Sequence, residues 1–122
     1  MPHRVRGGTM QIGELAERTG LSLRTIRHYD DVGLLPASRT EGGFRVYTEQ
    51  DVERLLVVRQ MKPLGFTLEE MAELLELLGA GPASPERLAD YLERARPERD
   101  KLARKLAQAD EFIAMLEHRL GR

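Results

Sequence analysis

Two short helical patterns joined by a tight, glycine-containing turn constrain the fold of this chain most strongly. In residues 11–19, Ile12, Leu15 and Ala16 recur at i, i+3 and i+4, the spacing of one apolar helix face. Gly20 follows and supplies the backbone freedom that the end of a helix commonly needs. A second short helix is predicted over residues 23–31. Together the two segments predict a helix-turn-helix, in which the second helix is the recognition helix.

The second helix is predicted to begin at Ser22, whose hydroxyl can accept a hydrogen bond from an amide of the first turn. Leu23 and Ile26 lie on one side and form a small apolar stripe. The other faces carry hydrogen-bonding side chains, namely Arg24, Thr25, Arg27, His28 and Tyr29. Such a face suits the major groove of DNA, where arginine reads guanine edges and threonine or tyrosine reaches phosphates or thymine methyls. The alternative is an ordinary solvated surface helix.

A small basic hairpin is predicted directly after this helix, which ends at Gly33. Gly42 and Gly43 separate two short segments that can pair as strands, because Gly-Gly is a permissive hairpin turn. The polar side chains around the turn are Arg39, Thr40 and Arg45, and those expected to pack beneath it are Phe44, Val46 and Tyr47. A basic hairpin beside an exposed helix is typical of a wing, whose amides and arginines suit phosphates.

Two further helices follow the hairpin, each announced by a capping box. Thr48 with Asp51 predicts the first and Thr67 with Glu70 the second. The expected core positions of the two helices are Val52, Leu55, Leu56, Val58, Met61, Leu68, Met71, Ala72, Leu75 and Leu78. The basic side chains of the first helix, predicted to contact phosphates, are Arg54, Arg59 and Lys62.

The C-terminal third predicts a helix that needs a partner. Ser84 and Pro85 suit an N-cap and a first helical position, and apolar residues then recur at alternating spacings of three and four, as in a coiled coil. Pro97 cannot donate to a continuing helix, so a break is predicted there, with a new helix from Pro97 to Leu120. Self-association is favoured over folding back. The predicted dimerisation residues are Leu102, Leu106, Ala109, Ile113, Leu116 and Leu120.

Composition limits the function classes. The 122 residues carry a net charge of −1, with 10 basic against 8 acidic residues in positions 1–67 and 9 against 12 thereafter, so only the front part is slightly basic. With no cysteine, disulfides and thiolate metal sites are excluded, and His3, His28 and His118 are too scattered for a zinc site. We expect no metal, no cofactor and no enzymatic activity. Without a signal sequence or a long apolar run, a cytoplasmic protein with no membrane partner is expected.

These observations divide the chain into four predicted regions. Residues 1–9 form a disordered basic arm, either a leader before a start near Met10 or an arm that grasps DNA. Residues 10–78 form the winged helix-turn-helix domain, and residues 79–84 form a linker. Residues 85–122 form the helical dimerisation region with its break near Pro97.

The segment IGELAERTGLSLRTIRHYDDVGLLPASRTEGGFRVYTEQDVERL, with the later LGFTLEEM, resembles the MerR family of bacterial transcription regulators. The resemblance runs from Met10 to about Leu78, and order, spacing and turn residues agree throughout. It implies a mainly α fold, with winged-helix heads joined by an antiparallel coiled coil into a two-fold dimer. Metal-sensing members carry thiolates around that coiled coil and multidrug-sensing members append a ligand domain, and this sequence shows neither.

Carried over by position, the resemblance implies three sets of DNA contacts. The helix contacts are Ser22, Arg24, Thr25, Arg27, His28 and Tyr29. The wing contacts are Arg39, Gly43, Phe44, Arg45 and Tyr47, with Phe44 standing where the family commonly has tyrosine. The contacts of a second wing and its helix are Arg54, Arg59 and Lys62.

The resemblance also implies a mechanism. The dimer would bind a pseudo-palindromic promoter site whose spacer is about two base pairs too long, which misaligns the polymerase elements by roughly 70° at about 10.5 base pairs per turn. Bending and untwisting the spacer would realign the elements for RNA polymerase, the second expected partner. Two rival interpretations are a phage-type excision or packaging factor with a winged head, and a coiled-coil adaptor, which leaves the wing arginines unexplained.

Overall fold

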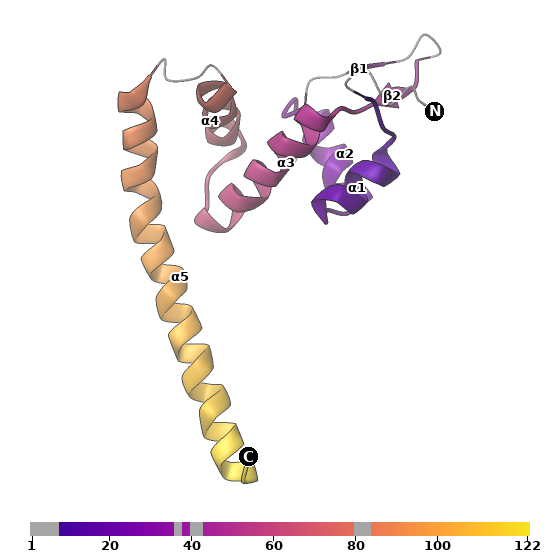
Figure 1. Cartoon of the computed structure of the whole chain (residues 1–122). Helices are drawn as coiled ribbons and strands as arrows, with labels where there is room; N and C mark the ends of the chain where they lie inside the picture. The colour runs from indigo at the N-terminus through magenta and orange to yellow at the C-terminus, as the bar shows by residue number, and fades with distance from the viewer. Residues whose placement is uncertain (1–7, 36–37, 40–42, 80–83) are drawn as a thin grey trace. The chain divides into compact units, whose positions relative to one another are not determined.

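The computed structural model describes residues 8–35, 38–39, 43–79 and 84–122, and these form a mainly helical protein, as predicted. Two compact units emerge, Met1–Gly79 and Ala80–Arg122. The first holds helices α1, α2, α3 and α4, a short 3-10 helix η2 (Lys62–Leu64) and strands β1 and β2, and the second holds the long helix α5 (Figure 1). The predicted arm, apart from Gly8 and Thr9, and most of the predicted linker lie outside the described residues.

Capping side chains begin α2, α3 and α4 where the sequence predicts. The Thr25 amide donates to the Ser22 hydroxyl at 3.1 Å at the start of α2 (Leu23–Asp31). Reciprocal capping-box bonds begin α3 (Glu49–Met61), and the pair Thr67 and Glu70 does the same for α4 (Leu68–Gly79). The predicted caps of α2, α3 and α4 are therefore confirmed.

The turn between α1 (Ile12–Thr19) and α2 requires glycine for two reasons. Gly20 has φ +73°, and its amide donates to the Ala16 carbonyl at 2.8 Å. A Cβ at this position would also lie 3.0 Å from a guanidinium nitrogen of Arg59, which donates to the Thr19 carbonyl. The turn is thus held from α3 as well as by its own backbone.

The core of the first unit is shared by all four helices. Leu15, Ile26 and Leu55 are 0% exposed, and Leu75 of α4 is 4% exposed. Leu23, predicted to share the apolar stripe of α2, is 40% exposed, because it is the first residue of the helix and lies one turn before the first buried position, Ile26.

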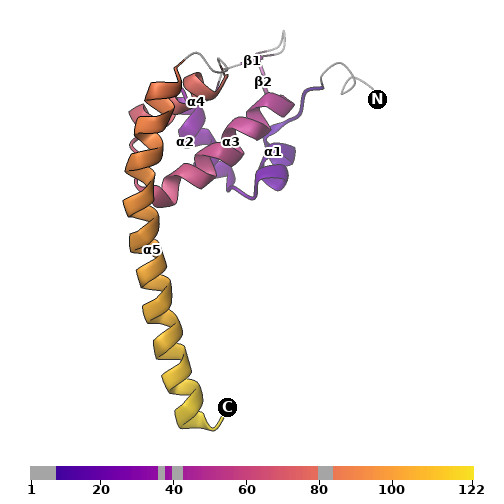
Figure 2. The ribbon, with the colours of Figure 1, turned by 60° about the vertical axis from the view of Figure 1, so that its left-hand side comes forward.

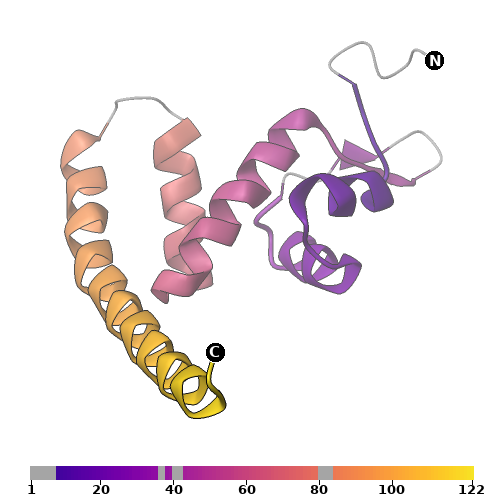
Figure 3. The same cartoon turned by 60° about the horizontal axis from the view of Figure 1, so that its bottom comes forward.

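The wing is a two-stranded antiparallel hairpin of β1 (Ser38–Arg39) and β2 (Arg45–Val46). The predicted turn falls partly on residues 40–42, outside the described residues. At the base of the hairpin, Tyr47 exchanges two backbone hydrogen bonds with Met10, so the segment that enters α1 runs beside the wing (Figure 3). Phe44 was expected to pack beneath the hairpin, but it is 73% exposed and only Tyr47 is buried.

The second unit corrects one prediction. Helix α5 (Pro85–Leu120) is a single 36-residue helix with Pro97 inside it (Figure 2), and no break occurs. Proline costs about 3 kcal/mol in a helix interior, but Pro97 is exposed, so the unbonded carbonyl one turn earlier can meet water. Ion pairs at i, i+3 join Glu93 to Arg96 and Glu98 to Lys101 on either side of it. At the start of α5, Ser84 occupies the N-cap position without a side-chain capping bond.

Among the described residues, none of the helices has the length and apolar character that crossing a bilayer would require.

Candidate nucleic-acid interface

Helix α2 exposes a cationic face opposite its buried face. Arg24, Arg27 and His28 are exposed and lie within one turn of each other, while Ile26 and Tyr29 are buried. Neither arginine makes a hydrogen bond or ion pair to another described residue. Both guanidinium groups therefore keep all their donors for an external acceptor.

Two other residues predicted to contact DNA, Ser22 and Tyr29, make contacts within the protein. The Ser22 hydroxyl accepts the Thr25 amide and donates to the Thr25 hydroxyl at 2.9 Å. Tyr29 is only 4% exposed, with its ring centroid 5.7 Å from that of His28, so most of its side chain lies in the core and its contact with DNA stays a prediction. The residue lies three positions after Ile26 and shares its buried face, a spacing that the interpretation overlooked.

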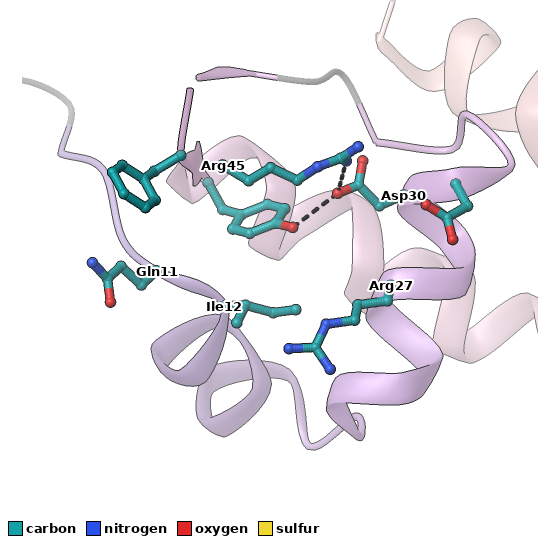
Figure 4. A pocket seen from close by; sticks show the side chains of 8 residues that line it. Gln11, Ile12, Arg27, Asp30 and Arg45 are labelled. Carbon is teal, nitrogen blue, oxygen red and sulfur yellow. Dashed lines mark hydrogen bonds and ion pairs between the residues drawn. The ribbon is translucent and has the colours of Figure 1, made fainter. Parts of the chain in front are cut away.

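The wing is bound to α2 through Asp30. The Arg45 guanidinium forms an ion pair with Asp30 Oδ2, and the Tyr47 hydroxyl donates to the same oxygen at 2.9 Å (Figure 4). Burial, with the hydrogen bond to Asp30 second, raises the pKa of Tyr47 to about 12. The same carboxylate raises the pKa of Arg45 through its hydrogen bond. Tyr47 is 4% exposed, so its side chain supports the wing from within the protein, and its contact with DNA stays a prediction.

A hollow of about 530 Å³ opens between the start of α1, the end of α2 and the wing. Arg27 and Arg45 reach it from two sides, with Ile12 and Gln11 at the α1 side (Figure 4). The exposed ring of Phe44 lines it at the wing, and Asp30, Asp31 and Tyr47 also contribute. These groups give the hollow apolar walls and polar edges.

The predicted contacts on α3 and on the following 3-10 helix η2, which begins at Lys62, separate into two kinds. Arg54 donates from Nε and Nη2 to the Leu34 carbonyl, at 3.2 and 2.8 Å, and Arg59 donates to the Thr19 carbonyl. Lys62 is exposed and makes no hydrogen bond or ion pair to another described residue. The two arginines hold the loop after α2 and the helix-turn-helix turn, whereas Lys62 is left for an outside partner.

Asp30 is the residue that sequence reasoning missed. It lies four positions after Ile26 and next to Tyr29, so helical spacing alone places it on the buried face. A carboxylate on a buried face needs a cationic or hydroxyl partner, and Arg45 and Tyr47 supply both. The wing contact Arg39 lies in β1, but its side chain is outside the described set.

The predicted dimerisation residues form an uncovered stripe on α5. Leu102, Leu106, Ile113, Leu116 and Leu120 are 39–64% exposed, and Ala109 is also exposed. Their spacings of four and three residues keep them on one side of the helix.

Comparison with known protein families agrees with this geometry. The family model for the MerR HTH family regulatory protein matches residues 10–78, which span the helix-turn-helix, the wing and the two following helices. The chain belongs to the MerR family. A second model, for the MerR DNA-binding region, matches residues 52–119 of this MerR-family chain.

Named relatives support the assignment. Heavy metal-dependent transcription regulator 2 of Rhizobium meliloti (strain 1021) is 39% identical over 114 residues, covering 92% of this chain and 75% of the relative. The mercuric resistance operon regulatory protein of Bacillus cereus is 42% identical over 82 residues, covering 66% of this chain and 62% of the relative. Of the Bradyrhizobium elkanii nodulation protein NolA, the chain covers 31%.

A solved structure shares the fold. HiNmlR, a MerR family regulator lacking the sensor domain and bound to promoter DNA, matches with a TM-score of 0.71 and 27% identity, over 93% of this chain and 84% of that chain. The predicted family and fold class are therefore confirmed. The relatives are regulators rather than enzymes, as predicted, and neither the phage-type factor nor the adaptor is favoured.

Proposed function

We propose that this chain is a homodimeric, sequence-specific DNA-binding transcription regulator whose helix α2 reads base edges in the major groove. One observation carries the proposal. Arg24 and Arg27 are exposed on one face of α2 without partners among the described residues, while the opposite face is fixed in the core by Ile26. A rigid helix that presents uncommitted guanidinium groups suits bidentate recognition of guanine. The similar HiNmlR was crystallised on promoter DNA.

Around α2, other groups would set the position of the protein on the phosphate backbone. At the start of the helix the Ser22 hydroxyl donates to the Thr25 hydroxyl, which leaves the hydroxyl hydrogen of Thr25 for a phosphate. Lys62 offers an exposed ammonium group. On the wing, Arg39 and the Gly43 amide would contact phosphates. Phe44 has no hydroxyl to donate, so we assign its exposed ring to apolar contact with a sugar.

The exposed stripe of α5 would be covered by the same stripe of a second copy. If the two α5 helices pack antiparallel, their contact, called the seam below, is two-fold and self-complementary. It also separates the two winged helix-turn-helix units, called heads below, so that each can enter its own major groove. Half-sites about one helical turn apart, roughly 34 Å, then suit a pseudo-palindrome. Joining two weak heads makes the second engagement intramolecular, which raises affinity by about 10² or more.

RNA polymerase is the second proposed partner. Within a promoter that has an over-long spacer, a dimer that bends and untwists the centre would bring the polymerase elements into register. Such a deformation costs on the order of several kcal/mol, and phosphate contacts from two heads would offset it.

Selection of bound sequences from random DNA, followed by one substitution, tests the proposal. Arg24→Ala should weaken binding to the selected site by about 1–3 kcal/mol and relax preference at one position in each half-site. Arg104→Ala removes an equally exposed arginine from α5 and serves as the control, with no change in preference. An equal loss on selected and random DNA would show that Arg24 contacts phosphate only. Failure of the wild-type protein to enrich any sequence would contradict the proposal.

A further inference from the structure

Helix α2, which is proposed to read DNA and is called the reading helix below, ends with a buried carboxylate, Asp30, that the proposed function does not explain. The side chain of Asp30 is 4% exposed, although it belongs to the helix that presents the cationic face. An ionised carboxylate withdrawn from water is costly unless it is paired and hydrogen-bonded. A negative charge close to a DNA-binding face would also repel phosphate. Asp30 must therefore be compensated within the protein.

Both described partners of Asp30 come from the strand side of the wing. Arg45 and Tyr47 are two residues apart, so their side chains share one face of the extended chain, and both meet Asp30 Oδ2 (Figure 4). The backbone of Tyr47 is fixed at the same point, because its amide donates to the Met10 carbonyl at 2.8 Å and its carbonyl accepts from the Met10 amide at 2.7 Å. One carboxylate thus joins the reading helix, the wing and the segment before α1.

The two arginines beside the hollow consequently differ. Arg27 makes no hydrogen bond or ion pair to a described residue, whereas the charge of Arg45 is offset by Asp30 and its side chain is only 37% exposed. Sequence position alone assigns both to DNA. Geometry leaves Arg27 free for DNA and commits Arg45 to the protein.

We propose that Asp30 is a positioning residue that fixes the wing against α2, and that Arg45 is the anchor of the wing instead of a phosphate contact. This inference rests on the proposed DNA-binding function. Holding the wing in place before DNA arrives removes the cost of ordering it during binding, so helix and wing engage one duplex as a unit.

Neighbouring carboxylates provide a matched test. Asp30→Asn and Asp31→Asn change the charge equally, but Asp31 is exposed, makes no hydrogen bond or ion pair to a described residue, and affects the pKa of Arg45 less than Asp30 does. Asp30→Asn should weaken binding to the selected operator by about tenfold, with the slope of log affinity against log salt unchanged. Asp31→Asn should bind as tightly as the wild type or tighter. Arg45→Ala should reproduce Asp30→Asn, and the double variant should be no weaker than either single variant.

The opposite role of Arg45 predicts the opposite sign. If Arg45 contacts phosphate, Asp30→Asn frees its guanidinium and should strengthen binding, and Arg45→Ala should reduce the salt slope by about 0.9. Either result overturns the proposal.

Hydrogen exchange of the protein without DNA separates positioning from a general loss of stability. In Asp30→Asn the Tyr47 amide should exchange faster, while the Met71 amide, bonded to the Thr67 carbonyl at the start of α4, should keep its rate. If Asp30→Asn does not fold, Tyr47→Phe removes one of the two bonds to Asp30 and should show a smaller effect in the same direction. Unchanged exchange at residue 47 in both variants overturns the proposal even if DNA binding is normal. If the wild type binds all duplexes equally, the proposed function fails, while faster exchange would still support the anchoring role of Asp30.

Discussion

The head buries its regularly spaced apolar side chains, whereas the C-terminal helix exposes them. In the unit Met1–Gly79, Leu15, Ile26 and Leu55 are fully buried. In α5, Leu106 and Leu120 are 63% and 64% exposed although they repeat with equal regularity. Apolar surface that remains in water gives up about 25 cal/mol per Å² of potential burial. The core of the head is therefore completed within its own unit, whereas the apolar residues near the end of α5 are exposed.

The largest effect should come from placing charge on the uncovered stripe. Ala109→Glu combined with Ile113→Lys should convert the proposed dimer to a monomer, since charges would be buried between the two α5 stripes. Sedimentation should report the monomer, and operator affinity should fall at least tenfold at fixed salt, because the two heads no longer bind as one molecule.

The head of that variant provides the internal control. Its core runs through Leu15, Ile26, Leu55 and Leu75, so its helical circular dichroism should persist. A double variant that stays dimeric places the seam elsewhere. One that is monomeric but binds a full operator as tightly as the wild type contradicts the two-headed mechanism.

Pro97→Ala should stabilise α5 and leave the head unchanged. Alanine restores the missing amide donor and removes a cost of about 3 kcal/mol in a helix interior. The midpoint of thermal unfolding, measured at fixed protein concentration, should rise. Helical content at low temperature should stay the same, because the helix is already continuous. An increase in helical content would instead indicate a break at Pro97 in solution.

Arg54→Ala should destabilise the head without changing base preference. Leu34 is 2% exposed, and loss of the two donors to its carbonyl should cost about 1–3 kcal/mol in the free energy of unfolding. Urea unfolding measures this loss, and Lys62→Ala, which removes a cation without a described partner, should leave stability unchanged. The opposite result, a shallower salt dependence of DNA binding with normal stability, would support the phosphate contact predicted from sequence.

The smallest effect concerns high pH. Because the pKa of Tyr47 is raised to about 12, its neutral form contributes stability that is complete below the unfolded value near pH 10 and is lost as pH rises toward 12. The free energy of unfolding should fall by about 1 kcal/mol between pH 10 and pH 11 through this group. Tyr47→Phe removes that component, so the difference between the two pH profiles isolates it. Parallel profiles would show that Tyr47 titrates normally.

The sequence by itself determined the order of elements and the family. Local interactions are sufficient for this, because the Ser22, Thr48 and Thr67 caps and the turn at Gly20 depend on residues only a few positions apart. The stripe on α5 was equally readable from its spacing, and its exposure agrees with that reading. The sequence did not determine whether Pro97 breaks the helix, because one proline competes with the helical preference of the residues on both sides.

Only the tertiary structure decided which polar side chains form hydrogen bonds or ion pairs within the protein. The sequence predicts a DNA contact for each of three arginines, Arg24, Arg45 and Arg54. In the structure, however, Arg45 pairs with the carboxylate of Asp30, and Arg54 donates to the carbonyl of Leu34. Tyr29 and Tyr47 look suitable for DNA but lie in the core. These assignments depend on contacts between segments distant in sequence, and the desolvation of a charge or hydroxyl is fixed only when those segments pack.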